Sequence, residues 1–329
     1  MLCKTGLTLF VSTLVAVGEA RVGARSGFSI PLNPPVALRR SDGTFDHHRA
    51  IVHLDHIMNK YRANLESNVG RAVSDEGVQI KRQNVPLDSS DISECLGPIT
   101  IGSNSQIALV SFDTVAPDLW VSNAQNCPDC AGHNTYDPTM SSSSHSVGDT
   151  AQIQYQGGTT ISGPLFTDTV SAGGVKVSNQ TFIAATQRSG LTNSFPIDGV
   201  FGLSYPSLSD LNAPPFVQSA FAQNVISSEG FSFALSSQGN SLFILGAANP
   251  TFYSGTLDTH PVNTSSGFWQ LGGTTLALDL QEVFTDLNVI MDTTTPFILG
   301  PPDQGPLHIP MLDRAQCLLP VGKQRLEDY

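Results

Sequence analysis

Charged residues are scarce in this chain, at 13 % of its 329 residues, about half of the usual share. The formal net charge is −12, an excess of acid that argues against the basic surface of a general nucleic-acid binder. At 40 % hydrophobic residues, the chain also lacks the polar composition of an intrinsically disordered protein. We therefore expect a folded protein whose partners do not include nucleic acid.

Cysteines and long apolar runs are also few. Five cysteines exclude a disulfide-dense miniprotein, and no apolar run after the N-terminus reaches the roughly 18 residues of a membrane helix. The chain contains no Gly-x-Ser-x-Gly, His-Glu-x-x-His or phosphate-loop pattern. Serine-hydrolase, zinc-protease and nucleotide-dependent chemistries therefore find no support in the sequence.

The first twenty residues have the organisation of a secretory signal peptide. Lys4 supplies a positive charge, residues 7–17 are mostly apolar, and Gly18 and Ala20 are the small residues of a cleavage site. The alternative is a membrane anchor, but eleven residues are too few to span a bilayer. We predict a signal peptide over residues 1–20 and a secreted, extracellular protein with no membrane association after its removal.

Charge divides the remaining chain into two parts. Residues 21–82 carry ten Lys and Arg against six Asp and Glu, a net charge of +4, whereas residues 83–329 carry a net charge of −16. The basic part holds four of the eight histidines and ends in Lys81-Arg82. We predict a removable pro-segment over residues 21–82 that covers the acidic body at neutral pH and loosens in acid. An ordinary basic tail is the alternative.

Turn-forming residues punctuate the rest of the sequence, which has 29 Gly and 21 Pro in all. Short stretches rich in β-branched and aromatic residues lie between the turns, for example at residues 98–102, 108–113 and 231–235. Helical periodicity is limited, and the best helix candidate is residues 215–224. The pattern predicts a mainly antiparallel β protein.

Two Asp-Thr pairs form an internal repeat. Asp113-Thr114 and Asp292-Thr293 both follow apolar residues, and they are 179 positions apart. If the two turns meet around a pseudo-twofold axis, their carboxylates share a proton. One carboxyl group then acts as a base toward a water molecule while the other donates a proton. On spacing alone, two unrelated Asp-Thr turns are the alternative.

Further motifs surround the repeat. In chain order they are Asp118-Leu119-Trp120-Val121, Cys127-x-x-Cys130, Tyr155 ahead of Gly157-Gly158, Ile197-Asp198-Gly199-Val200-Phe201-Gly202, and Phe268-Trp269-Gln270. With this set and order, the sequence from about residue 85 to 301 resembles the pepsin-like aspartic endopeptidases, notably the secreted fungal members. The resemblance implies a mainly β, bilobal pepsin-like acid-protease fold with pseudo-twofold symmetry and an active cleft between the lobes. It also implies hydrolysis of peptide bonds at acid pH by an activated water, without a metal or cofactor.

The resemblance assigns roles to single residues. Asp113 and Asp292 match the catalytic dyad. Thr114 and Thr293 match the threonines whose hydroxyl groups link the two active-site turns. It also implies protein or peptide substrates, the pro-segment as an intramolecular inhibitor, and a monomer.

Two aromatic residues match the flap of the family. Tyr155 stands at the position of the tyrosine in a mobile hairpin over the substrate, and Trp120 at the position of the residue that supports it. For both residues, simple aromatic packing is the alternative.

Four positions depart from the family pattern near the expected dyad. Val115 and Thr294 stand where glycine normally follows Asp-Thr, Ala116 replaces a serine, and Gln156 replaces a flap glycine. The backbone N–H donors survive these changes, but a displacement of about 1 Å can cost a hundredfold in rate. The second hypothesis is therefore a catalytically impaired or inactive relative that binds peptides or acts as a decoy. A secreted β protein that binds carbohydrate or cell wall is the third.

The resemblance also predicts how the chain is divided. We expect an N-terminal lobe over residues 83–262, with the first Asp turn and the flap. A partial C-terminal lobe over residues 263–329 would then carry the second Asp turn, because pseudo-symmetry calls for a longer one. The tail from about residue 305 matches no part of the family.

Cys127 and Cys130 fall where the family has a small disulfide loop, so we predict a disulfide between them. A zinc site that adds His133 is the alternative, but it lacks a fourth ligand, and we expect no metal. Asn179 and Asn263 begin glycosylation sequons.

Overall fold

The computed structural model describes residues 28–32, 95–155, 159–189, 197–235, 241–246, 248, 250–253, 255–278, 281–295, 299–300 and 319–320. The predicted signal peptide, the predicted pro-segment apart from residues 28–32, and Gln156 lie outside these residues. So does the tail after residue 305 apart from residues 319–320.

The described residues are mainly β, as predicted. The strands are β1 (Phe28–Leu32), β2 (Leu96–Ile101), β3 (Gln106–Asp113), β4 (Trp120–Ser122), β5 (His145–Tyr155), β6 (Thr159–Ala172), β7 (Val175–Ala185), β8 (Gln187–Ser189), β9 (Gly199–Gly202), β10 (Phe231–Ala234), β11 (Ser241–Leu245), β12 (Val262–Asn263), β13 (Gln270–Leu278), β14 (Gln281–Ile290), β15 (Leu299–Gly300) and β16 (Leu319–Pro320). The helices are the α-helix α2 (Phe216–Ala222) and the 3-10 helices η1 (Pro128–Cys130), η2 (Pro138–Met140), η3 (Pro206–Leu208), η4 (Pro250–Phe252) and η5 (Thr264–Ser266).

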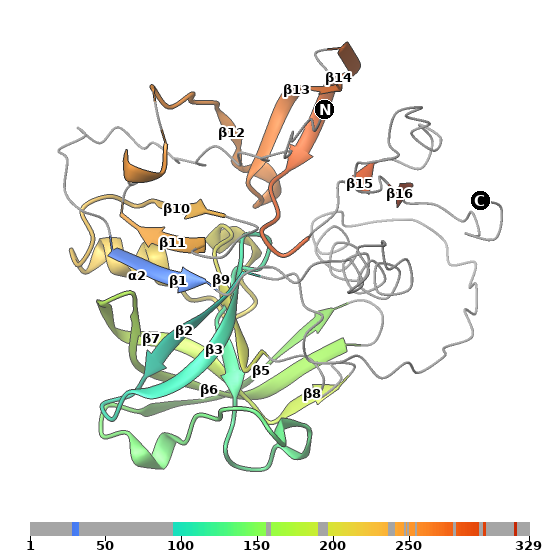
Figure 1. Ribbon diagram of the computed structural model, residues 1–329. Coiled ribbons are helices and arrows are strands. Elements are labelled where there is room, and N and C mark those ends of the chain that lie inside the picture. The colour runs from blue at the N-terminus through green and yellow to red at the C-terminus, as the bar shows by residue number, and fades with distance from the viewer. Residues whose placement is uncertain are drawn as a thin grey trace, which may run out of the picture.

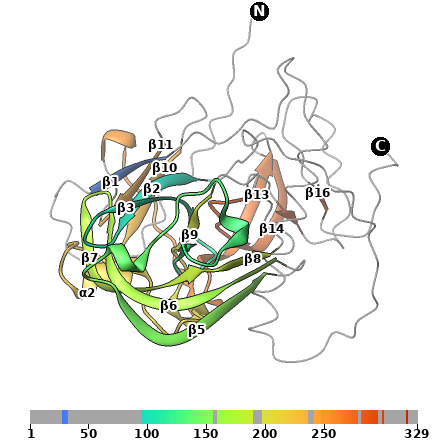
Figure 2. The same ribbon diagram turned by 90° about the horizontal axis from the view of Figure 1, so that it is seen from below.

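An eight-stranded sheet closes on itself. Its order is β2-β3-β9-β4-β7-β6-β5, with β8 also paired to β6. The 14-residue strand β6 pairs with β2 as well, through Ile101 opposite Val170, so the strands from β2 to β6 form a ring. Each strand of the ring therefore has a paired neighbour on both sides. Strands β5 and β8 lie outside the ring, beside β6 (Figures 1 and 2).

Asp113 lies at the end of one buried strand of this ring and opposite the end of another. The last four residues of β3 are buried, as expected for a strand that is covered on both faces. Strand β9 is buried throughout and pairs parallel with β3, which places Gly202 opposite Asp113. A Cβ atom at residue 202 would collide with the backbone of Pro117. Glycine is therefore needed for β9 to approach the turn this closely.

A second sheet, β1-β11-β10, packs beside the ring (Figure 1). Strand β1 belongs to the predicted pro-segment and pairs antiparallel with β11 over five residues, starting with Phe28 opposite Leu245. Ile30 is 2 % exposed and lies in the main core. The same core holds Phe112 and Phe243, whose rings stack at 4.6 Å. Part of the predicted pro-segment is thus a strand of this sheet, with Ile30 in the core.

The third sheet, β12-β13-β14, leads to Asp292 and stands apart from the ring in Figure 1. Hydrogen bonds join the segment before β13 to the end of β9. The indole N–H of Trp269 donates to the Leu203 carbonyl at 2.8 Å, and Ser204 Oγ donates to the Gly267 carbonyl at 2.6 Å. These bonds link the two parts of the chain that carry the Asp-Thr pairs.

The predicted helix within residues 215–224 is confirmed as α2. Pro215 precedes its first turn, where a missing N–H is tolerated. Phe216, Val217 and Ala220 are buried against the core.

Candidate active site

Asp113 is the last residue of β3 and is 4 % exposed. The backbone N–H of Val115 donates to Asp113 Oδ1 at 2.9 Å. The backbone N–H of Leu203 donates to the Asp113 carbonyl at 2.9 Å, which ties this turn to the end of β9. A buried carboxylate needs such donors. The turn supplies one of them through the backbone N–H of Val115, which stands where the family has glycine.

Asp292 lies just after β14 in a turn with the same pattern. The backbone N–H of Thr294 donates to Asp292 Oδ1 at 2.8 Å. The Thr294 hydroxyl donates to the same oxygen at 2.7 Å, and the Thr295 hydroxyl donates to Asp292 Oδ2. Both carboxylate oxygens therefore accept hydrogen bonds within the turn, which fixes the orientation of the carboxyl group.

The two turns are joined by reciprocal hydrogen bonds between Thr114 and Thr293. Thr114 Oγ1 donates to the Met291 carbonyl at 2.8 Å and accepts the N–H of Thr293 at 3.1 Å. Thr293 Oγ1 donates to the Phe112 carbonyl at 2.7 Å and accepts the N–H of Thr114 at 3.2 Å. Each threonine thus makes the same contacts to the other turn, and the arrangement has local twofold symmetry. Because the two aspartates directly precede these threonines, the bonds bring their turns together.

Cys95, to which the sequence assigned no role, also lies at this junction. Its Sγ donates to the Thr293 carbonyl at 3.2 Å, and its carbonyl accepts the N–H of Phe112 at 3.0 Å. It therefore contacts both turns.

Tyr155 and Trp120 belong to one apolar cluster beside Asp113. Trp120, the first residue of β4, is 1 % exposed, and the half-buried Tyr155 at the end of β5 packs against the cluster that contains it. Burial and the Asp113 carboxylate raise the pKa of the Tyr155 hydroxyl, and the indole N–H of Trp120 opposes that shift. The Trp120 N–H is buried and makes no hydrogen bond of good geometry within the described residues. Tyr155 and Trp120 thus share one cluster without a hydrogen bond from the indole N–H to any residue in the described part of the chain.

Asp118 lies between the Asp113 turn and Trp120 and is 5 % exposed. It accepts hydrogen bonds from Ser209 Oγ at 2.5 Å and from the Asp210 N–H at 2.9 Å. Burial nevertheless raises the pKa of its carboxyl group to about 6. The sequence named Asp118 only as part of the Asp118-Leu119-Trp120-Val121 motif and predicted no role for its carboxylate.

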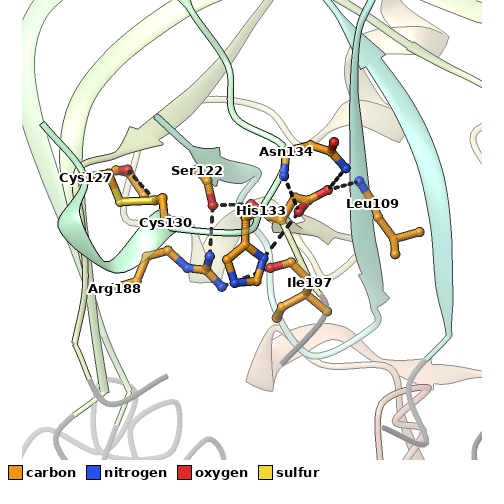
Figure 3. A network of polar contacts seen from close by, with 10 residues as sticks. Leu109, Ser122, Cys127, Cys130, His133, Asn134, Arg188 and Ile197 are labelled. Atoms are coloured by element: carbon orange, nitrogen blue, oxygen red, sulfur yellow. Dashed lines mark hydrogen bonds and ion pairs between the residues drawn. A yellow bond between two sulfur atoms is a disulfide. The ribbon is translucent and has the colours of Figure 1, made fainter. Parts of the chain in front are cut away.

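A second buried polar network was also missed (Figure 3). Asp198 accepts hydrogen bonds from the Leu109 N–H at 2.7 Å, and from the backbone and side chain of Asn134 at 2.9 and 2.8 Å. His133 Nδ1 lies 3.4 Å from Asp198 Oδ1. Burial and the nearby Arg188 lower the pKa of His133 despite the Asp198 carboxylate. The sequence feature that could have indicated this network is the acidic Asp198 inside the otherwise apolar Ile197-Asp198-Gly199 motif.

The predicted disulfide between Cys127 and Cys130 is present. Both sulfur atoms are used in it, and His133 faces Asp198, so the zinc alternative loses its thiolate ligands.

Both sequon asparagines, Asn179 and Asn263, are exposed. Asn263 Oδ1 accepts the backbone N–H of Ser265 at 3.1 Å and its hydroxyl at 2.7 Å. Both side chains are therefore on the surface.

The chain matches the family model described as eukaryotic aspartyl protease over residues 94–305. It belongs to that family. It is 33 % identical to pepsin A of Callithrix jacchus over 224 residues, which cover 66 % of this chain and 57 % of that protein. It is also 33 % identical to an aspartic protease of Phaffia rhodozyma over 219 residues, which cover 66 % of this chain and 53 % of that protein. The chain thus spans more than half, but less than two thirds, of these relatives.

Family membership and the β-rich architecture agree with the predicted bilobal, pepsin-like fold. Among the described residues, no helix is long and apolar enough to cross a membrane.

Proposed function

We propose that the protein is an aspartic endopeptidase that hydrolyses peptide bonds in acid, with Asp113 and Asp292 as its catalytic dyad. The observation that carries this proposal is the reciprocal bonding of Thr114 and Thr293, because it joins two matching Asp turns from distant parts of the chain. Family membership supports the reaction class.

In this mechanism the two carboxyl groups share one proton. The ionised group takes a proton from a water molecule, which attacks the peptide carbonyl, while the protonated group donates to the carbonyl oxygen. As the tetrahedral intermediate collapses, the group that took the water proton gives it to the departing amine, and the other group takes a proton back from a hydroxyl of the intermediate. Tyr155, at the end of β5 and close to Asp113, would cover the bound peptide.

The backbone of Val115 and Thr294, the two residues that stand where the family has glycine, supports catalytic activity. The N–H groups of Val115 and Thr294 donate to Asp113 and Asp292 at 2.9 and 2.8 Å, which are ordinary N–H···O lengths. The β-branched side chains therefore leave both donors in place, and we expect the turns to work without glycine.

The proposal is tested with the full-length chain, activated in acid, on a denatured protein substrate. We expect cleavage that peaks in acid, is blocked by a statine-type transition-state mimic, and disappears in Asp113→Asn and in Asp292→Asn. Glu282→Gln, at an exposed carboxylate of β14, is the matched control and should stay active. Cleavage that needs zinc or is stopped by a serine-directed reagent would rule the proposal out.

A catalytically impaired relative that binds peptides or acts as a decoy is the second candidate. Val115 is fully buried and Thr294 is 5 % exposed, so two bulky side chains stand close to the proposed dyad. If they misalign it, the double variant Val115→Gly/Thr294→Gly should raise kcat much more than it changes KM, because these residues act on alignment rather than on uniform binding.

The two candidates predict opposite results for that double variant. A parent that is already active, with kcat unchanged on reversion, supports the endopeptidase. A parent without activity that gains it on reversion supports the impaired relative. Each reversion is also expected to cost up to about 1 kcal/mol of stability through the entropy of the unfolded chain, measured by denaturant unfolding.

We further propose a secreted, monomeric protein that acts on protein or peptide substrates. A signal peptide over residues 1–20 and an inhibitory pro-segment over residues 21–82 would precede the two lobes at 83–262 and 263–329. The charge division supports the pro-segment, as does the pairing of β1 with β11. The exposed Asn179 and Asn263 are the proposed glycosylation sites, and glycosidase treatment of the secreted protein should lower its mass.

A further inference from the structure

Arg188 is a buried cation that the proposed mechanism does not use. It lies in β8 and is 1 % exposed. Its Nη1 donates to Ser122 Oγ at 3.1 Å and its Nη2 donates to the Ile197 carbonyl at 2.9 Å (Figure 3). Its Nε is buried and makes no hydrogen bond within the described residues. Burial lowers the pKa of this guanidinium, while the carboxylates of Asp198 and Asp129 act in the opposite direction.

Packing alone is a poor explanation for this residue. A buried cation with an unsatisfied N–H loses hydration that its remaining contacts replace only in part, and an apolar side chain of similar length would fill the same space at lower cost. The positive charge is therefore expected to have a specific interaction partner.

That partner is the indole ring of Trp120. The Arg188 guanidinium carbon lies 5.5 Å from the ring centroid, within the range of a cation–π interaction. Such contacts are stronger when both groups are shielded from water, as they are here. The two hydrogen bonds of Arg188 reach Ser122 on the strand that carries Trp120, and Ile197 in the same apolar cluster. Arg188 thus contacts the Trp120 ring, the strand that carries it and the cluster in which it lies.

Strand pairing connects Arg188 with the strand that carries Tyr155. Strand β8 pairs with β6 through Arg188 opposite Ile161, and Ile161 in turn lies opposite Ile153 of β5. Tyr155 follows two residues later, at the end of β5, and packs against the cluster of Trp120. Within that cluster, the Trp120 indole N–H acts against the rise that burial causes in the pKa of the Tyr155 hydroxyl.

We propose that Arg188 is a positioning residue for Tyr155 and acts through Trp120. The guanidinium holds the indole ring in one orientation, so that the indole N–H, unpaired among the described residues, is available to the Tyr155 hydroxyl when a peptide occupies the site. The kinetic part of this inference rests on the proposed endopeptidase function, whereas the coupling between the three side chains does not.

The kinetic test is a double-mutant cycle in the full-length chain with Arg188→Met, Tyr155→Phe and the double variant. We expect Arg188→Met to lower kcat/KM about tenfold, the effect of losing one desolvated cation–π contact. In the Tyr155→Phe background the same change should have little further effect, because its route of action is gone. Arg188→Lys, which keeps the charge but not the two-pronged hydrogen bonding, should recover part of the loss.

Gln187→Met is the matched control, since it makes the same kind of change on the exposed side of β8. It should leave kcat/KM unchanged. Equal effects of Arg188→Met in the Tyr155 and Tyr155→Phe backgrounds would show a purely structural role and overturn the proposal. If Arg188→Met does not fold, the same cycle is run with Arg188→Lys and is expected to show a smaller but still non-additive effect.

A second readout needs no activity. The chain has two tryptophans, so in a Trp269→Phe background the emission comes from Trp120. We expect Arg188→Met to increase acrylamide quenching of Trp120 severalfold, less so once Tyr155 is also replaced, and Gln187→Met to leave quenching unchanged. A parent without peptidase activity would contradict the proposed function, and the fluorescence cycle would then decide this inference alone. Unchanged or additive quenching overturns it.

Discussion

At the scale of single residues, hydrogen-bond donors decide what the acidic side chains can do. Asp113 and Asp292 are each held by a backbone N–H two residues later, and that donor does not depend on which side chain follows. Both donors are therefore present with Val115 and Thr294 in place of glycine. Asp118 has two donors as well, but its burial is the larger effect.

We expect Asp118 to make the stability of the fold depend on pH. Burial raises the pKa of its carboxyl group from 3.8 to about 6, so the folded state binds the proton more tightly than the unfolded state. Its contribution is therefore fully present below pH 4 and is lost as the pH rises toward and through 6, by about 3 kcal/mol at most. We expect the melting temperature of the parent to fall over this range, and that of Asp118→Asn to fall less.

Melting curves between pH 3.5 and 7 check this prediction. Asp149→Asn, at an exposed carboxylate of β5, is the control and should follow the parent. If Asp118→Asn loses as much stability between pH 4 and 6.5 as the parent does, Asp118 is not the responsible group.

At the scale of elements, β1 shows how the N-terminal segment is attached. Opposite net charges predict an association that salt weakens, because screening acts over about 8 Å at physiological ionic strength. The pairing of β1 with β11 and the burial of Ile30 add a contribution that salt does not screen. At β1, the N-terminal segment is thus attached to the rest of the protein by apolar contacts and hydrogen bonds. For the remaining part of the segment, we predict that charge attraction contributes to the attachment.

We expect Ile30→Asp to lower the free energy of unfolding of the full-length chain by about 3 kcal/mol, the usual cost of placing an unpaired polar group in a packed core. Ile107→Asp is the matched control, since Ile107 is 61 % exposed on β3 and its replacement should cost little. Urea unfolding at low and high salt measures both variants. A loss for Ile30→Asp that disappears at high salt would contradict an apolar role for β1.

At the scale of the whole molecule, the two Asp turns come from different sheets and meet only through tertiary contacts. Strand β3 lies in the closed ring and β14 in the β12-β13-β14 sheet, and the threonine hydrogen bonds span about 180 residues of sequence. The bonds from Trp269 to Leu203 and from Ser204 to Gly267 hold the same two regions together. The proposed site therefore depends on both parts of the chain at once.

The sequence by itself determined the mainly β architecture and the α2 helix, because each depends on local patterns of β-branched residues and prolines. The Cys127–Cys130 disulfide followed from the resemblance to the family. The sequence also pointed to the two Asp-Thr pairs as one repeat. Only the tertiary structure decided that β1 pairs with β11 and brings Ile30 into the core, and that Arg188, His133 and Asp198 share a buried network. These features depend on which distant residues become neighbours and on how much water the fold removes from them, and neither quantity is written in any local pattern.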